Sequence, residues 1–470
     1  MEGLIQNETK FSLRVDKDSK ATEFRLFSTA PPHMRAFHLA WVSLFACFFS
    51  TFAIPPLIPV IRDNLNLTDS DIGNAGIASF CGSIISRLLM GPACDLFGPR
   101  LASSALSILT APIVFATSLA SSPRDFILLR FLIGFSIGNF VSNQYWMSSM
   151  FSGNVVGLAN GFAAGWANVG SGATQLLMPL IYSYITSLGV ASFTAWRVAF
   201  ILPASLQLVT AWMVLYYGQD LPNGNCNHFR KVAEEDDASP KDSFLRILCL
   251  GLKNYRGWIL ALTYGFCFGV ELTVDNIIAQ YFYDRFNLKI QTAGAIAASF
   301  GLANFLARPI GGVISDEMGR RYGIRGRLWS LWVVQTMAGV LCVILGRVNS
   351  LSASFMVMCG FSLFVQAASG LTFGVVPFVS KRQASLSFIP ILNLVSSIFL
   401  YNTDIMFFAG FTPFSKETGI SVMGLMIIIC TLPVTLLYFP QSGGMFCGPS
   451  MVNSQEDYCS LARGDAEEEQ

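Results

Sequence analysis

Apolar runs of about 20 residues recur twelve times along this chain of 470 residues, and they constrain its fold more than any other feature. A helix needs about 20 such residues to cross the hydrocarbon core of a bilayer. Only 13% of the residues are charged, against about 25% in a typical soluble domain. The sequence therefore predicts an all-α membrane protein with twelve transmembrane helices. The predicted spans are residues 38–61, 71–94, 101–119, 125–148, 155–185, 196–217, 256–282, 291–315, 328–346, 352–379, 384–409 and 418–439.

A polar insert at residues 218–255 divides these spans six and six. The predicted organisation is an N-terminal segment (1–37), a first six-helix half (38–217), a linker (218–255), a second half (256–439) and a tail (440–470). Cations gather in the short loops after the eighth and tenth spans, at residues 320–327 and 381–382. Because such loops stay on the cytosolic side, we expect both termini, the linker and the tail in the cytosol.

The composition also excludes several classes of function. The net charge is only +1, so no global field attracts nucleic acid. The three histidines lie outside the predicted span interiors, and the eleven cysteines form no Cys-x-x-Cys pair. No nucleophile elbow, phosphate-binding loop or metal-ligand helix motif occurs. We therefore expect no enzyme activity, no metal site and no cofactor.

An internal repeat relates the two halves. The second predicted span ends with Arg87, Gly91, Asp95, Gly98 and Arg100. The eighth ends with the same residue types at a constant offset of 221 residues: Arg308, Gly312, Asp316, Gly319 and Arg321. Two parallel six-helix repeats are the architecture of transporters that work by rocking between two states.

These Gly-x-x-x-Asp-x-x-Gly-x-Arg loops resemble the signature of the major facilitator superfamily, with its twelve-helix fold. Four further stretches resemble the nitrate/nitrite porter family and its plant high-affinity nitrate transporters. They are residues 130–146, 157–172, 269–276 and 366–378. The sequence of residues 139–153 is most similar to the vacuolar-membrane branch. The resemblance implies transport of nitrate across a plant membrane, with nitrite as a further candidate substrate.

Arg87 and Arg308 are the main candidates for substrate binding. Each lies about two turns inside the membrane, where a guanidinium costs several kcal/mol unless it is paired or faces water. Its planar fork suits a flat oxyanion, and the family's anion-binding arginines match these two positions. The alternative is an ion pair with the carboxylate at the end of the same helix, but about 12 Å of helix separates the two. We expect the arginines to converge at the molecular centre without a permanent partner.

The fifth span carries small residues and one amide on a single stripe: Gly157, Gly161, Gly165, Asn168 and Gly172. Glycines at this spacing either let two helices pack backbone to backbone or contact the substrate directly. Asn168 offers an amide donor, and the family has a nitrate-binding asparagine at this position.

Three polar residues share one face of the seventh span: Tyr264, Glu271 and Asp275. The family has an anion-contacting tyrosine where Tyr264 stands. Carboxylates in an apolar span need water, a cation or a proton. Glu271 and Asp275 are thus candidates for proton coupling, although Asp275 also fits a position near the outer interface.

Five other charged residues are predicted to act in conformational change. Arg130 fits helix packing or a gating ion pair better than a ligand role. The repeat residues Asp95, Arg100, Asp316 and Arg321 are predicted to latch neighbouring helices.

Proton coupling follows from energetics and resemblance. Bringing one anion into a negative interior costs about 2.3 kcal/mol per 100 mV, and the family's plant members are proton symporters. The resemblance also implies a small single-span accessory membrane protein. The membrane is predicted to be vacuolar or plasma membrane.

One region departs from the family pattern. The eleventh span should repeat the glycine stripe of the fifth, yet no glycine occurs between Gly374 and Gly410. Bulky residues there would prevent close helix contact. A substituted exon or a retained intron in the gene model would explain such an abrupt change in the sequence. Two alternatives to a nitrate transporter therefore stand: a non-transporting nitrate sensor or inactive splice variant, and a facilitator of another small anion.

Overall fold

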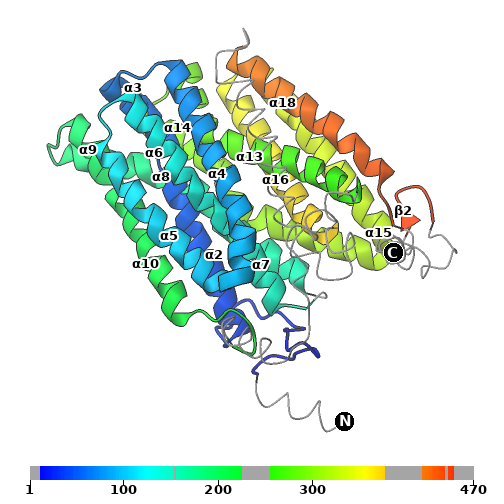
Figure 1. Ribbon diagram of the computed structural model, residues 1–470. Coiled ribbons are helices and arrows are strands. Elements are labelled where there is room, and N and C mark those ends of the chain that lie inside the picture. The colour runs from blue at the N-terminus through cyan, green and yellow to red at the C-terminus, as the bar shows by residue number, and fades with distance from the viewer. Residues whose placement is uncertain (1–10, 153–154, 225–254, 376–414, 440–442, 449–470) are drawn as a thin grey trace, which may run out of the picture.

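The computed structural model describes residues 11–152, 155–224, 255–375, 415–439 and 443–448, and helices dominate it (Figure 1). The N-terminal half comprises α2 (His33–Thr51), η1 (Pro55–Leu57), α3 (Ile58–Leu65), α4 (Asp69–Phe97), α5 (Pro99–Ala116), η2 (Thr117–Leu119), α6 (Pro123–Gly134), η3 (Phe135–Gly138), α7 (Asn139–Met150), α8 (Val156–Ser187), α9 (Ser192–Ala199) and α10 (Ile201–Tyr217). The C-terminal half comprises α13 (Tyr255–Phe286), α14 (Ile290–Leu302), α15 (Asn304–Leu345), α16 (Leu351–Val375), α18 (Lys416–Thr431), η5 (Leu432–Leu436) and a hairpin of β1 (Tyr438–Phe439) and β2 (Gly443–Gly444).

These helices match the predicted spans wherever the structure describes the chain. Nine helical segments of the described residues are long and apolar enough to cross a membrane. One of them, Ile290–Leu345, holds the predicted eighth and ninth spans, which a kink at Gly323 separates. The predicted eleventh span (384–409) lies outside the described residues, as do most of the predicted linker and tail.

The two halves lie side by side in Figure 1, with α2 to α10 in blue to green and α13 to α18 in green to orange. Helix α8 joins them, because it packs along both α14 and α15. Each half has its own apolar core. A third cluster bridges the halves and brings together rings from three helices: Phe48, Phe140 and Phe268.

Local sequence explains how the helices begin and end. Thr68 and Ser122 form capping boxes at the starts of α4 and α6, where they satisfy backbone N–H groups that have no partner within the helix. Gly98 has φ +83°, which only glycine adopts without strain, and it turns the chain from α4 into α5. In the second half the turn falls at Gly323, with φ +63°, rather than at the repeat glycine Gly319.

The bundle has two end faces, which lie at opposite ends of its helices. The N-terminal face holds residues 11–32, the Gly98 turn and Asp220. There Ala21 bridges to Phe151 just after α7 ends, so this part of the N-terminal segment packs on the bundle. The distal face is the opposite one, where α3 ends and the α13–α14 connection lies.

Candidate anion site between the two halves

Two buried guanidinium groups, one from each half, lie at the centre of the molecule. Arg87 projects from α4 and Arg308 from α15, and both side chains are fully buried. The Cζ atom of Arg87 lies 5.5 Å from the centre of the Phe268 ring, and that of Arg308 lies 5.3 Å from the same centre. The two guanidinium groups therefore cannot be farther apart than the sum of these distances, so the predicted convergence is observed.

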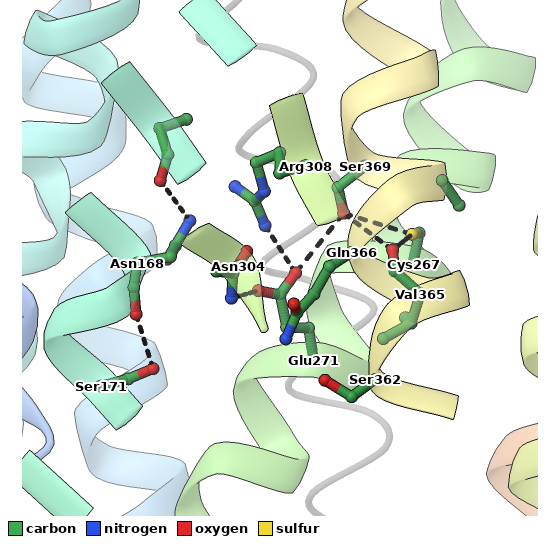
Figure 2. A network of polar contacts seen from close by, with 12 residues as sticks. Asn168, Ser171, Cys267, Glu271, Asn304, Arg308, Ser362, Val365, Gln366 and Ser369 are labelled. Atoms are coloured by element: carbon green, nitrogen blue, oxygen red, sulfur yellow. Dashed lines mark hydrogen bonds and ion pairs between the residues drawn. The ribbon is translucent and has the colours of Figure 1, made fainter. Parts of the chain in front are cut away.

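Arg308 has a carboxylate partner, contrary to the expectation that neither arginine has one. Its Nη2 atom donates to Oε2 of Glu271 at 2.6 Å, and both side chains are fully buried. Figure 2 shows Glu271 between Arg308 and Ser369, with Asn304 Nδ2 donating to its other oxygen at 2.7 Å. Asp316, the carboxylate at the end of the predicted eighth span, is not the partner and pairs with Arg327 instead.

Several buried polar atoms around the two arginines form no hydrogen bond with another described residue. Among the described residues, Nε and Nη1 of Arg308, the hydroxyl of Tyr264 and Oδ1 of Asn168 are buried without a hydrogen-bond partner. Buried polar groups in proteins are nearly always bonded. The site therefore has free donors on Arg308 and Tyr264 that match the three acceptor oxygens of a small oxyanion.

Helix α13 supplies one continuous face of this site. Tyr264, Glu271 and Asp275 lie on it as predicted, and Phe268 stands between them with its ring stacked on that of Tyr264 at 5.3 Å. Asp275 is buried within the bundle, and its Oδ1 has no hydrogen-bond partner within the described residues. Sequence reasoning missed Phe268, although its spacing of four from Tyr264 places it on the same face.

Asn168 lies on α8, across from the Glu271 network in Figure 2. Its Nδ2 donates to the carbonyl of Ala164 in its own helix at 3.0 Å. One of the two amide hydrogens is thus used locally. The amide oxygen has no partner among the described residues.

The glycine stripe of α8 divides into two parts. A Cβ atom at Gly172 would collide with the backbone of Gly301 and Leu302, and one at Gly165 would lie 3.0 Å from the carbonyl of Asn304. Gly157 and Gly161 are less confined, since the nearest atoms to such a Cβ lie 3.9 and 4.0 Å away. Close packing against the second half therefore depends on Gly165 and Gly172.

A related close approach positions Arg308. A Cβ atom on Gly370 of α16 would collide with the backbone carbonyl of Arg308. Because glycine allows this contact, the neighbouring Ser369 reaches within 3.4 Å of Glu271. The packing of α15 on α16 thus fixes both partners of the ion pair.

Comparisons with known proteins agree with this architecture. A model of the Major Facilitator Superfamily matches residues 40–389. The chain is 58% identical to "High affinity nitrate transporter 2.5" of Arabidopsis thaliana, over 98% of this chain and 91% of that protein. It is 57% identical to "High affinity nitrate transporter 2.7" of the same plant (96% and 92%) and 56% identical to "High-affinity nitrate transporter 2.3" of Oryza sativa subsp. japonica (98% and 88%). The chain belongs to the high-affinity nitrate transporter family of the major facilitator superfamily.

Solved structures support the fold alone. A bacterial homologue of the human lysosomal transporter Spinster, in an inward-facing and unoccupied conformation, matches with a TM-score of 0.63 at 14% identity. The match covers 86% of this chain and 96% of that one. The family and this fold agree with the all-α membrane architecture predicted from the apolar spans.

Several hydrogen bonds between the halves lie on the distal side of the site. Gln175 of α8 donates to the backbone carbonyl of Asp275 at 2.6 Å, and Gln291 donates to Ser183 at 2.6 Å. Arg130 donates to the carbonyl of Thr51 at 3.2 Å and to Oδ1 of Asn276 at 3.1 Å. Arg130 thus links the two halves through an amide of the other half, whereas the sequence predicted helix packing or a gating ion pair.

The loop residues of the repeat make contacts within each half. The backbone N–H of Arg100 donates to Asp220 at 2.9 Å, and the Arg100 side chain forms an ion pair with the same carboxylate at 3.6 Å. Asp316 is bonded by Arg327 at 2.8 Å, whereas the repeat residue Arg321 is exposed and bonds Glu317 of its own helix. Arg327, and not the predicted Arg321, therefore forms the ion pair with Asp316, because the turn in this half falls at Gly323. The side chain of Asp95 is outside the described part of the structure.

No group of three or more His, Cys, Asp or Glu side chains that could hold a metal ion occurs among the described residues.

Proposed function

We propose that the protein is a proton-coupled nitrate transporter that binds the anion between Arg87 and Arg308 and works by alternating access. The observation that carries the proposal is the pair of buried guanidinium groups, one per half, beside a single phenyl ring. The names of the relatives, 56–58% identical over nearly the whole chain, support nitrate as the substrate.

The chemistry of the site favours a small flat oxyanion. Two arginines provide charge-assisted donors in fixed planes, and a planar anion with three equivalent oxygens uses such forks fully. Tyr264 is placed to donate from its unbonded hydroxyl, and Asn168 from its second amide hydrogen. The surrounding rings, such as Phe140 and Phe268, make the walls between the arginines apolar and aromatic.

The ion pair of Arg308 with Glu271 supports proton coupling. Glu271 accepts a hydrogen bond from a donor of Arg308 that nitrate would need, so carboxylate and nitrate compete for one cation. Protonation of Glu271 removes this competitor, and the two binding events therefore favour each other. Asp275 lies one turn away, also buried, and is the candidate for a second proton. More than one proton per nitrate makes the transported charge positive and lets a negative membrane potential drive uptake.

The distal contacts support a rocking cycle. The interactions of Arg130, Gln175 and Gln291 tie the halves together on one side of the arginines. Opening a path from the distal face would break them. In the proposed orientation both termini are cytosolic, the membrane is plasma or vacuolar, and a single-span accessory protein assists.

Nitrate uptake in oocytes tests the proposal through the variants Arg87→Lys and Arg308→Lys. Lysine keeps the charge and loses the planar fork, so we expect each variant to lose at least about 90% of uptake at low nitrate, a cost of about 1.4 kcal/mol or more. The matched control is Arg320→Lys, which changes an exposed arginine. Surface biotinylation checks that all three reach the membrane. Undiminished uptake by both central variants would remove the paired-arginine site.

The missing glycines of residues 381–409 favour a second candidate, a nitrate sensor or inactive splice variant. These residues lie outside the described structure. Nitrate binding by the purified protein without uptake, unchanged when family-type glycines are restored, would select this candidate. Competition by nitrite, chlorate and small carboxylates in the same binding assay tests the other alternative, a facilitator of a different anion.

A further inference from the structure

Two adjacent amides in the middle of α7 have no bonding partners. All four polar side-chain atoms of Asn143 and Gln144 are buried without a hydrogen bond in the described structure. The two side chains are 3% and 0% exposed. Both belong to the stretch of residues 130–146 that resembles the nitrate porters, and the central site uses neither of them.

Neighbouring buried amides show that this is unusual. Nδ2 of Asn139, one turn earlier in α7, donates to Ser107 at 2.7 Å. Gln207 donates to Thr110 at 2.6 Å and to Ser136 at 3.2 Å. The amide groups of Asn139 and Gln207 thus donate to neighbouring side chains, whereas neither atom of the Asn143 or Gln144 amide is bonded among the described residues. An unpaired buried amide destabilises the fold, so Asn143 and Gln144 need another reason to be polar.

Helix geometry places the two amides beside the transport path. At 100° per residue, Asn143 and Gln144 lie within about 60° of Phe140 on either side and about one turn farther along α7. Phe140 packs against Phe268 of the other half at 5.1 Å, and the Cζ atom of Arg87 lies 6.0 Å from its ring. Helix α7 continues from there to Met150 and the N-terminal face. The amides therefore lie between the arginine pair and that face.

We propose that Asn143 and Gln144 form a second subsite for a small, partly hydrated oxyanion, on the N-terminal side of Phe140. Their N–H groups donate to the anion, and their carbonyl oxygens bind its water molecules. Neutral donors hold an anion less tightly than two arginines, which suits a step where the anion must leave. The inference rests on the proposed function and extends it: nitrate passes from Arg87 to these amides on its way to the N-terminal face.

The test uses near-isosteric apolar variants, Gln144→Met and Asn143→Leu, singly and together. Nitrate itself is the probe, in calorimetric binding to the purified protein and in oocyte uptake. We expect the double variant to bind nitrate within about twofold of the native affinity while its maximal uptake rate falls about tenfold. Its melting temperature should stay equal or rise, because unpaired buried amides are removed. The matched control is Asn64→Leu on α3, which should leave uptake unchanged.

Two results would overturn the subsite. Native uptake by the folded double variant would mean that the amides bind nothing that transport requires. Loss of nitrate binding together with uptake would place the amides in the central site instead. Failure of the proposed function itself is distinguishable, because the unmodified protein would then fail to transport nitrate.

Discussion

Replacing Glu271 by glutamine tests whether the Glu271 carboxylate and nitrate compete for Arg308. Glutamine keeps the size of the side chain and removes the charge that pairs with Nη2 at 2.6 Å. A charge-assisted hydrogen bond contributes about 1.5–3 kcal/mol. Nitrate no longer has to displace it, so we expect the variant to bind nitrate about 10- to 100-fold more tightly where Glu271 of the native protein is ionised.

The sign of the pH dependence follows from the same competition. In the proposed cycle nitrate binding is coupled to proton uptake at Glu271, so nitrate affinity of the native protein should rise as the pH falls. In Glu271→Gln this dependence is lost. The variant also leaves a buried guanidinium without its carboxylate, which costs about 3–5 kcal/mol of stability in the absence of anion. Nitrate should therefore raise its melting temperature more than that of the native protein.

Calorimetric titration of the purified protein with nitrate between about pH 5.5 and 8 measures both effects. The matched control is Glu317→Gln, which removes a partly exposed glutamate paired with Arg320 and Arg321. This control should keep the native affinity and the native pH profile. A native affinity that does not change with pH, or a Glu271→Gln variant with native affinity, would refute the competition between carboxylate and nitrate.

Two further predictions concern packing and gating. Gly172→Ala should destabilise the protein by about 1–3 kcal/mol through overpacking against α14, whereas Gly161→Ala, with no atom closer than 4.0 Å to the new Cβ, should melt at the native temperature. Cross-linking Ser183→Cys to Gln291→Cys with a short thiol-specific reagent should fix the distal contact and stop uptake until the link is cleaved by a reductant. Single-cysteine variants are the control, and full uptake by cross-linked protein would contradict the gating role.

Sequence patterns predicted the features that depend on spacing within one helix or on the repeat between the two halves. Span lengths, the offset between Arg87 and Arg308 and the common face of Tyr264, Glu271 and Asp275 all follow from spacing along the chain. Convergence of the two arginines follows from the pseudo-symmetry of the halves. These features need no knowledge of how neighbouring helices are rotated.

These patterns could not predict which side chains of different helices contact each other. The pairing of Glu271 with Arg308 depends on the rotation of α13 against α15, and Asn304 joins it from one turn before Arg308. The repeat predicted that Asp316 and Arg321 latch neighbouring helices, but the turn falls at Gly323 and the cation that pairs with Asp316 is Arg327. The sequence repeat therefore predicted the position of the loop, but not that Arg327 is the arginine that pairs with Asp316.

The position of nitrate itself tests the central claim most directly. An experimental structure of the protein at saturating nitrate and low pH should show the anion within hydrogen-bond distance of both Arg87 and Arg308, with Glu271 released from Nη2. Nitrate bound elsewhere while Glu271 remains on Arg308 would contradict the account.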